Sequence, residues 1–248
     1  MINIVVPMAG EGARFKQQGF TFPKPLIEIK KKPMIHWVVK NITPKEQHRI
    51  IFICLKSHFD QYALRQMLPL IAPDCRIVPI QGKTEGAACT VMLASDHFNN
   101  DDELVIANGD QFIEADINEF IADARKKKLD GSILTFDSTH PKWSYARVGE
   151  GGYVTEVAEK KPISTHATVG IYYYRRGKDF FQAASAMIDK DVRVNGEFYV
   201  CPVYNQMIDG NKKVGIFEIS AEKMHGLGTP EDLAEFKSSP VYAAMGSM

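Results

Sequence analysis

Short apolar runs alternate with segments of helical periodicity along the whole chain. The runs carry continuous apolar residues, which is typical of strands buried on both faces, whereas the segments between them repeat apolar residues every three or four positions. We therefore expect strands at 2–6, 50–55, 76–80, 104–107, 132–136, 168–174 and 214–219, and helices at 34–41, 59–68, 86–95, 116–127, 178–188 and 198–208.

This alternation predicts an α/β fold with three layers, in which helices cover both faces of a mixed, mostly parallel, Rossmann-like sheet. No internal repeat or long linker interrupts it, so residues 1–237 are expected to form a single domain. Within it, 143–162 predicts two short strands around Gly149-Glu150-Gly151-Gly152, as a hairpin inserted in the sheet or lying over the site. Residues 238–248 predict a tail that is frayed or packs as an arm.

Composition and charge exclude several function classes. Of 248 residues 45% are hydrophobic, and the 30 basic residues balance 30 acidic ones, so no overall field favours a nucleic-acid polymer or an anionic membrane. No apolar run approaches the roughly 20 residues that span a bilayer, and the N-terminus lacks the features of a signal peptide. Four scattered cysteines without a C-x-x-C pair indicate reduced thiols, so a cytoplasmic protein is expected.

The first strand leads into a loop suited to binding phosphates. Gly10-Glu11-Gly12-Ala13-Arg14 offers a backbone that phosphates can approach closely, and Pro23-Lys24-Pro25 adds a second cation. The segment 81–86 and Asn108-Gly109-Asp110 also follow strands. Because ligands of open α/β sheets bind at the carboxyl ends of the strands, we expect these three loops to share one crevice.

Two common nucleotide motifs fit these glycines poorly. A dinucleotide fingerprint requires a third small residue where Phe15 stands, a helix directly after the loop and an acidic residue about twenty positions later, and the sequence shows none of them. Gly82-Lys83-Thr84 imitates the end of a P-loop, but Ile77 occupies the position of that motif's first glycine.

Taken in order, the motifs resemble the nucleotidyltransferase family that makes sugar nucleotides and related activated phosphates. That family has G-x-G-x-R after the first strand, then P-K, G-D, E-K-P and G-T-P-E-D-L. The resemblance spans residues 2 to about 237 and implies a GT-A-like, nucleotide-diphospho-sugar transferase fold. The matching segments are Gly10–Arg14, Pro23-Lys24, Gly109-Asp110, Glu159-Lys160-Lys161-Pro162 (with one extra lysine) and 228–233.

The resemblance implies that an acceptor phosphate attacks the α-phosphorus of a nucleoside triphosphate and expels pyrophosphate, with Mg²⁺ as cofactor. Arg14 would bind the leaving pyrophosphate through its planar fork, and Lys24 would lie near the α-phosphate. Asp110 would hold Mg²⁺, although alone it is also compatible with an Asx turn. The remaining nucleotide contacts implied by the resemblance are Met8, Ala9, Gly10, Gly12, Gln81, Gly86, Asn108 and Gly109, of which Gln81 and Gly86 would face the base.

The acceptor side is implied less sharply. Glu159 would bond a hydroxyl and either Lys160 or Lys161 the acceptor phosphate, the extra lysine leaving the register open. Glu197 is compatible with an acceptor contact and equally with an acid in the first turn of a helix. Aromatic residues on this side suit stacking on a sugar, enclosing a small cation, or the core; they are Trp143, Tyr145, Phe198 and Tyr199, with Tyr145 assigned to the acceptor.

One departure from the family pattern concerns the metal. Relatives often carry a second metal-binding Asp two residues before the glycine of G-T-P, where this chain has Gly226. Either Asp110 and the triphosphate hold Mg²⁺ without it, or a neighbour such as Glu222 replaces it, or an unusual acceptor requires altered geometry. His225 is interpreted as a structural residue.

The resulting prediction is a cytoplasmic nucleotidyltransferase, with CTP as first choice, serving capsule or other surface-polysaccharide precursors. Its partners would be the triphosphate, a small phosphorylated acceptor (a sugar, polyol or similar phosphomonoester) and a second copy of the chain. A glycosyltransferase using a ready-made nucleotide sugar is an alternative, yet Asn108-Gly109-Asp110 lacks the Asp-x-Asp metal motif expected there. A non-catalytic nucleotide-binding subunit is another.

Overall fold

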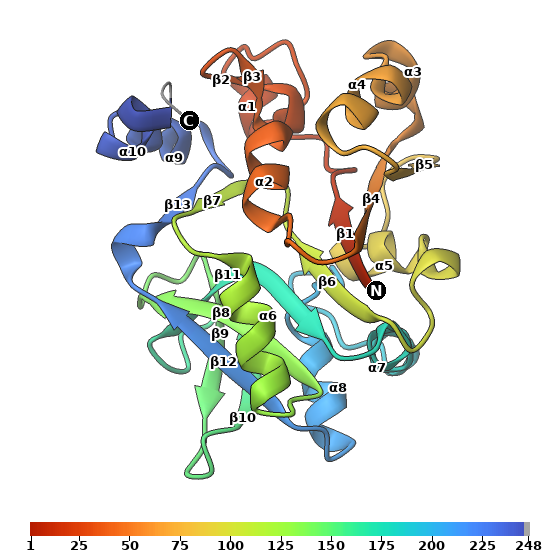
Figure 1. Cartoon of the computed structure of the whole chain (residues 1–248), viewed down its shortest axis with the longest axis vertical. Coiled ribbons are helices and arrows are strands. Elements are labelled where there is room, and N and C mark those ends of the chain that lie inside the picture. Colours follow the sequence, from red (N-terminus) through yellow and green to blue (C-terminus); the bar gives the residue numbers. More distant parts are fainter. Residues whose placement is uncertain (246–248) are drawn as a thin grey trace.

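The structure, a computed structural model, describes residues 1–245. At its centre is a mixed nine-stranded sheet in which β10, β9, β11, β6, β1, β4 and β5 lie in that order, while β8 pairs with β11 and β12 (Figure 1). Its strands are β1 Ile2–Pro7, β4 His48–Leu55, β5 Arg76–Ile80, β6 Glu103–Ala107, β8 Gly131–Asp137, β9 Ser144–Val148, β10 Val154–Glu159, β11 His166–Tyr174 and β12 Val214–Ile219.

Helices cover both faces of this sheet, which confirms the three-layer α/β/α prediction (Figure 1). One apolar cluster packs α2, α4 and α6 on one face, and another packs α5, α7 and α8 on the other. The helices are α1 Ala13–Gln17, α2 Met34–Ile42, α3 Lys56–Gln61, α4 Leu64–Ile71, α5 Ala87–Met92, α6 Ile117–Lys126, α7 Gly177–Asp189, α8 Val203–Asp209, α9 Pro230–Lys237 and α10 Pro240–Ala244, with 3₁₀ turns at Lys24–Leu26, Ser95–His97 and Ala221–Lys223.

The strands β1, β4, β5 and β6 run parallel, so their carboxyl ends meet at one edge of the sheet. β11 pairs antiparallel with β6, and a register shift between Thr168 and Tyr172 surrounds Gly170. The predicted hairpin consists of β9 and β10, and it joins the sheet through a pairing of Tyr145 with Ala167. These pairings place the turns after β1 and β6 beside the base of the hairpin.

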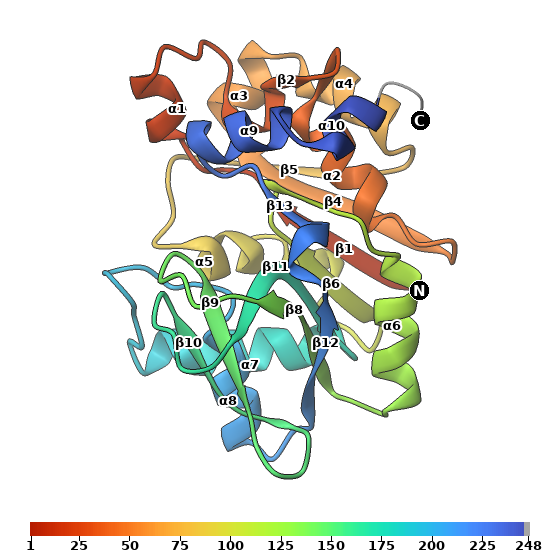
Figure 2. The same ribbon diagram turned by 90° about the vertical axis from the view of Figure 1, so that its left-hand side faces the viewer.

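A third apolar cluster joins the two ends of the described chain. Phe15 of α1 and Trp37 of α2 pack with Leu233 and Phe236 of α9, and Met245 is buried there. Figure 2 shows α9 and α10 beside α1 and β2. Two small sheets complete this region: β2 Glu28–Ile29 with β3 Lys32–Pro33, and β7 Gln111–Ile113 with β13 Met224–Gly226. The last part of the predicted tail, 246–248, lies outside the described residues.

Three helix predictions need correction. The helix expected at 59–68 is divided into α3 and α4, because Ala63 has a left-handed backbone with φ of 50°. The helix expected from 198 begins only at Val203. Finally, the sequence predicts no helix directly after the first loop, and this is wrong, because α1 begins there. That part of the argument against a dinucleotide site therefore does not hold. The five residues of α1 are too few to show periodicity.

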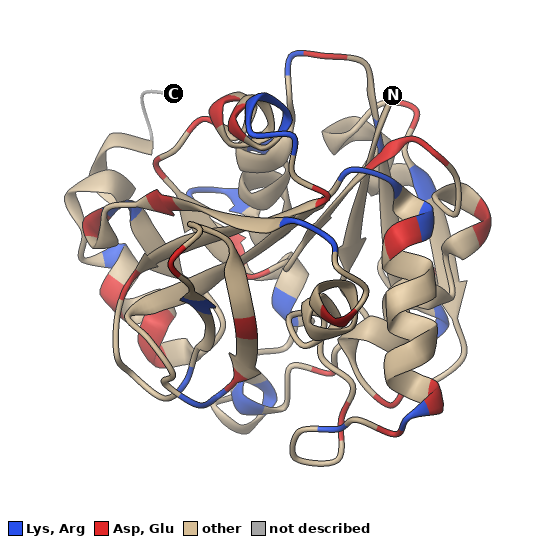
Figure 3. Ribbon diagram, turned by 90° about the horizontal axis from the view of Figure 1, so that it is seen from below, with Lys and Arg blue, Asp and Glu red and all other residues tan. Residues whose placement is uncertain are grey.

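Charged residues of both signs are interspersed over the ribbon in Figure 3, in keeping with the balanced composition. Among the described residues, no helix combines the length and apolar character needed to cross a bilayer.

Candidate functional site

A cavity of about 630 Å³ opens where the carboxyl ends of β1 and β6 meet the base of the β9–β10 hairpin. It brings together most of the residues expected from the sequence. Those on its wall are Met8, Ala9, Gly10, Gly12, Arg14, Lys24, Gly86, Asn108, Gly109, Asp110, Glu159 and Glu197.

The first loop forms one wall of the cavity. Gly12 has φ of 62° and caps α1, and a Cβ placed on it would lie 3.3 Å from Cβ of Lys24. Glycine at this position therefore suits both the left-handed backbone and the close approach of the Lys24 segment. Phe15 anchors α1 in the third apolar cluster, while Arg14 remains exposed at the cavity.

Lys24 and Asp110 meet across this wall. Nζ of Lys24 donates to Oδ2 of Asp110 over 2.7 Å, and about a quarter of each side chain is exposed. Asp110 directly follows the turn after β6, and its carbonyl accepts from the backbone N–H of Leu227. A cation and a carboxylate thus share one point at the end of the sheet, where a triphosphate and its metal ion could separate them.

The turn after β6 is held by β11. The backbone N–H of Asn108 donates to the carbonyl of Gly170 over 2.9 Å, and the side chain of Asn108 fills the space beside Gly170. Gly170 has φ of 91°, and a Cβ there would lie 2.4 Å from Nδ2 of Asn108. A glycine inside a strand indicates such a close approach. The position of Gly170 within the apolar run 168–174 is therefore a sequence signal for this contact.

Gly86 forms the opposite wall. It has φ of 142°, and a Cβ there would lie 2.3 Å from the carbonyl oxygen of Phe198. Backbone hydrogen bonds from Phe198 to Glu85 and from Ala88 to Phe198 hold the two segments together. Gln81, predicted to face the base, lies exposed after β5 and outside the described cavity wall. Lys83 and Thr84 reach the wall instead.

The acceptor-side residues divide into two groups. Oγ of Ser144 donates to Oε2 of Glu159, and burial raises the pKa of Glu159, as does the negative charge of Glu197 to a smaller extent. Nζ of Lys160 donates to the Tyr199 hydroxyl over 2.6 Å and lies 4.5 Å above its ring. Lys160 and Lys161 are both exposed and off the described wall, but Lys160 is tied to this side through Tyr199, which lines the cavity.

Two predictions on this side are corrected by the structure. Tyr145 is fully buried in the apolar core and donates its hydroxyl to the carbonyl of His140, so it cannot contact an acceptor. Glu197 does not begin a helix, because its backbone pairs with Val194 and the next residue, Phe198, pairs with the Gly86 segment. Its carboxylate accepts from Lys83 over 3.2 Å. Burial acts to raise the pKa of Glu197, but the hydrogen bonds from Lys83 and Tyr199 outweigh it, so the pKa is lowered.

The neighbours of Gly226 are not those expected. Glu222 and His225 lie off the wall of the main cavity and line a second, smaller pocket that shares Gly226 and Asp232 with it, and His225 pairs with Glu114 over 3.0 Å. The carboxylate beside Gly226 in the main cavity belongs to Asp232 of α9. The sequence interpretation treated this acid as part of a helix start, which it also is, because its backbone N–H donates to the Thr229 hydroxyl.

The donor chemistry of the cavity suits Mg²⁺, which takes oxygen ligands from one or two carboxylates together with substrate phosphates. Asp110 offers such a carboxylate at the cavity. Within residues 1–245, no group of three or more His, Cys, Asp or Glu side chains is arranged to hold a metal by itself. A metal here would therefore complete its coordination with phosphate oxygens and water.

Comparison with known proteins shows the family of this chain. The family model described as "Nucleotidyl transferase" matches residues 4–235, and the chain belongs to that family. A curated relative, the "Bifunctional protein GlmU" of Thermotoga maritima, is 26% identical over 209 residues, which cover 82% of this chain and 44% of that protein. The chain thus spans about half the length of curated relatives of this kind.

Solved structures show the same fold. A nucleoside-diphosphate-sugar pyrophosphorylase from Vibrio cholerae RC9 superposes with a TM-score of 0.80 at 23% identity, covering 95% of this chain and 100% of that one. An inositol-1-phosphate CTP transferase from T. maritima superposes with a TM-score of 0.71 at 14% identity, covering 98% of this chain and 94% of that one. At these identities the likeness concerns the fold, and it confirms the predicted fold class.

Proposed function

We propose that this chain joins a nucleoside monophosphate to a phosphorylated small acceptor. An oxygen of the acceptor phosphate forms a bond to the α-phosphorus of the triphosphate, and the bond from that phosphorus to the β-phosphate oxygen breaks, releasing pyrophosphate. The observation that carries the proposal is the convergence of Arg14, Lys24 and Asp110 on one cavity beside a glycine loop. No protein nucleophile is needed, since the acceptor supplies it.

In this proposal the charged residues of the site supply most of the catalysis. Lys24 would leave Asp110 for the α-phosphate, and Arg14 would bind the leaving pyrophosphate. Bound Mg²⁺, held by Asp110, would neutralise triphosphate oxygens. Positioning and charge neutralisation are the main sources of catalysis in phosphoryl and nucleotidyl transfer.

CTP is our first choice of nucleotide, and capsule or other surface-polysaccharide precursors are our proposed use. A T. maritima structure of the same fold is named an inositol-1-phosphate CTP transferase, which supports this choice. Gly86 lines the cavity, and we propose that its backbone faces the base. Glu159, Lys160 and Glu197 would contact the acceptor. Residues 1–237 would form the single nucleotidyltransferase domain.

Pyrophosphate release tests the proposal. Purified protein with Mg²⁺ would be supplied with ATP, GTP, CTP, UTP or dTTP, each crossed with sugar, polyol and choline phosphates. We expect release that requires both a nucleotide and an acceptor, and Lys24→Ala should lower its rate about 10²–10³-fold. Transfer from a nucleotide sugar without pyrophosphate release would favour the glycosyltransferase alternative, and nucleotide binding without product from any acceptor would favour the non-catalytic one.

A further inference from the structure

Asp232 lies where Gly226 leaves a gap in the cavity wall. A Cβ placed on Gly226 would have as neighbours Cγ of Asp232 at 3.5 Å, Cη2 of Trp143 at 3.5 Å and Oδ2 of Asp232 at 3.6 Å. A side chain at 226 would therefore point to the place that the Asp232 carboxylate already occupies. Gly226 belongs to β13 and Asp232 to α9, so two different elements supply the position and the charge.

The carboxylates of Asp110 and Asp232 approach the same point. A Cβ placed on Gly228 would lie 3.1 Å from Oδ2 of Asp110 and 3.9 Å from Oδ2 of Asp232. Asp110, from the segment between β6 and β7, and Asp232 of α9 thus flank Gly228, and both line the cavity. Each acid also forms an ion pair with a lysine. Lys24 pairs with Asp110 over 2.7 Å, and Lys142 pairs with Oδ1 of Asp232 over 2.8 Å. A lysine neutralises each acid while Oδ2 of Asp232 still faces Gly226 and Gly228.

A third side chain in this wall has unsatisfied hydrogen-bonding groups. Gln111 is 3% exposed and lines the cavity directly after Asp110. Within the described residues its amide oxygen and nitrogen have no hydrogen-bond partner, and its backbone is paired opposite Gly226. A buried amide without a partner is unfavourable, so this position favours a polar ligand or a water molecule beside Gln111.

We propose that Asp232 is the second carboxylate that faces the metal ion of the bound triphosphate, in place of a side chain at Gly226. The inference rests on the proposed function. Asp232 and Asp110 provide two hard oxygen donors, Mg²⁺ requires one or two besides phosphate, and the Gln111 amide can bond a metal-bound water. Lys142, displaced from Asp232, becomes a free cation beside the acceptor site. Helix α9 would then serve catalysis as well as the third apolar cluster.

The test is the metal dependence of nucleotide binding, measured by calorimetry with CTP in Mg²⁺ or in EDTA, and repeated with ATP, GTP, UTP and dTTP if CTP does not bind. The readout is the ratio of Kd without metal to Kd with metal. Asp232→Asn is expected to reduce this ratio about tenfold or more, while Kd in EDTA does not weaken. A purely structural role would weaken binding in both conditions alike, which would overturn the proposal.

Matched variants sharpen the result. Glu231→Gln changes the adjacent acid of α9, which is exposed and bound to Gln18, and its ratio should equal that of the unaltered protein. Glu222→Gln should also leave the ratio unchanged, and a loss there instead would overturn the assignment. Gly226→Asp combined with Asp232→Ala should restore the ratio, because alanine vacates the place to which a side chain at 226 points, and Gly226 has no left-handed φ.

Two outcomes separate this proposal from the proposed function. If Asp110→Asn loses the metal dependence and Asp232→Asn keeps it, the assignment of Asp232 is wrong and the nucleotidyl-transfer proposal stands. If the unaltered protein binds none of the five nucleotides in either condition, both proposals are overturned together. Circular dichroism melts of each variant exclude misfolding as the cause of a lost ratio.

Discussion

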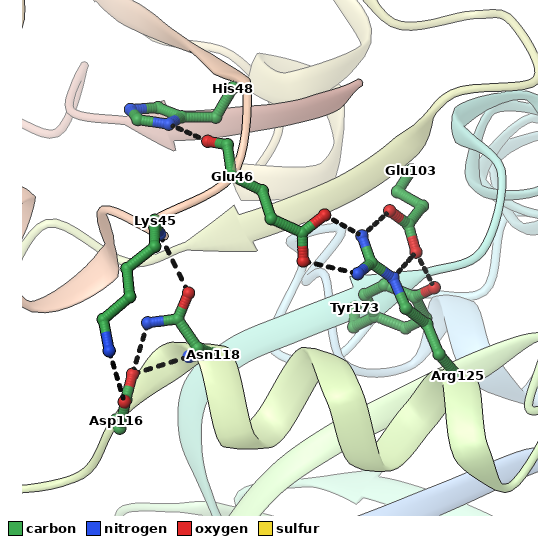
Figure 4. A network of polar contacts seen from close by, with 8 residues as sticks. All are labelled: Lys45, Glu46, His48, Glu103, Asp116, Asn118, Arg125 and Tyr173. Atoms are coloured by element: carbon green, nitrogen blue, oxygen red, sulfur yellow. Dashed lines mark hydrogen bonds and ion pairs between the residues drawn. The ribbon is translucent and has the colours of Figure 1, made fainter.

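The two edges of the parallel strands carry the same kinds of residue in two different arrangements. At the amino edge, Arg125 of α6 binds Glu46 and Glu103, and Tyr173 donates to Glu103 over 2.6 Å (Figure 4). We call these four residues the Arg125 network. The guanidinium makes four hydrogen bonds of 2.5–3.0 Å to the two carboxylates, and they raise its pKa further above its ordinary value.

At the carboxyl edge, lysines meet carboxylates through single contacts beside an open cavity. Lys24 makes one hydrogen bond to Asp110, and Lys142 makes one to Asp232. Breaking such a single contact frees both partners for other charges, whereas opening the Arg125 network would separate a bidentate pair. The number of hydrogen bonds that each cation makes to carboxylates therefore distinguishes the two ends of the strands. The Arg125 network supports the fold, whereas the Lys24 and Lys142 contacts are available to ligands.

The largest expected effect comes from removing a cation at the carboxyl edge. Lys24→Ala and Arg14→Ala should each lower turnover about 10²–10³-fold, in the range observed when a group that stabilises transition-state charge is lost. Lys16→Ala is the matched control, because Lys16 also lies on exposed α1 but off the described cavity wall. Near-normal rates of pyrophosphate release in both variants would remove the loop from catalysis.

A methyl group at Gly86 should disturb the cavity wall. Gly86→Ala puts a Cβ against the Phe198 carbonyl at a φ that L-residues rarely adopt. We expect a loss of unfolding free energy of about 2 kcal/mol together with weaker nucleotide binding, measured by urea unfolding and calorimetry. Gly82→Ala is the control, since its positive φ is similarly unusual but its Cβ meets open space. Equal nucleotide affinity in the two variants would contradict the role of this wall.

Opening the Arg125 network should affect stability and leave turnover unchanged. Arg125→Met should lower the free energy of unfolding by about 1 kcal/mol, the modest value appropriate to a partly exposed but bidentate ion-pair cluster. Urea unfolding at low and high salt measures it, with a smaller loss at high salt. If turnover falls as far as in Lys24→Ala, the contrast between the two edges does not hold.

The smallest effect concerns Glu159 and pH. Its pKa in the folded protein is raised above 4.5, mainly by burial. Its contribution to stability is therefore complete at acid pH and is lost as pH rises through the raised pKa. Glu159→Gln does not ionise, so its stability relative to the unaltered protein should increase from pH 4 to neutral pH in urea unfolding. A difference that is constant with pH would show that Glu159 is not perturbed.

The fold followed from continuous apolar runs, whereas parts of the site depended on contacts between distant segments. The strands at 76–80 and 214–219 have the predicted bounds, because their ends are marked by polar residues and turns. Ala63 carries no sequence signal for its left-handed backbone, and Phe198 is held in a non-helical form by its pairing with the Gly86 segment. The departure at Phe198 arises from tertiary structure overriding local propensity.

Within the site, the motifs placed Lys24 and Asp110 correctly at one cavity, but not Asp232 or Lys142. These two residues are ninety positions apart and meet only through the packing of α9 near the hairpin. Tyr145 could have been corrected by the alternation of a strand, since Ser144 and Tyr145 must face opposite sides. Ser144 bonds Glu159 at the cavity, and Tyr145 therefore points into the core.

The most direct test of nucleotidyl transfer at this cavity follows two phosphates of one nucleotide. CTP labelled at the α-phosphate and, separately, at the γ-phosphate would be incubated with the protein, Mg²⁺ and the acceptor found by the pyrophosphate screen. The account predicts that the α-label appears in a new diphosphate ester and the γ-label in pyrophosphate, in equal amounts, and that Lys24→Ala forms both about 10²–10³-fold more slowly. The contradicting result is an α-label that stays in the nucleoside triphosphate, or appears only in the free monophosphate, with every acceptor. That result would have to hold for CTP and for each of the other four nucleotides.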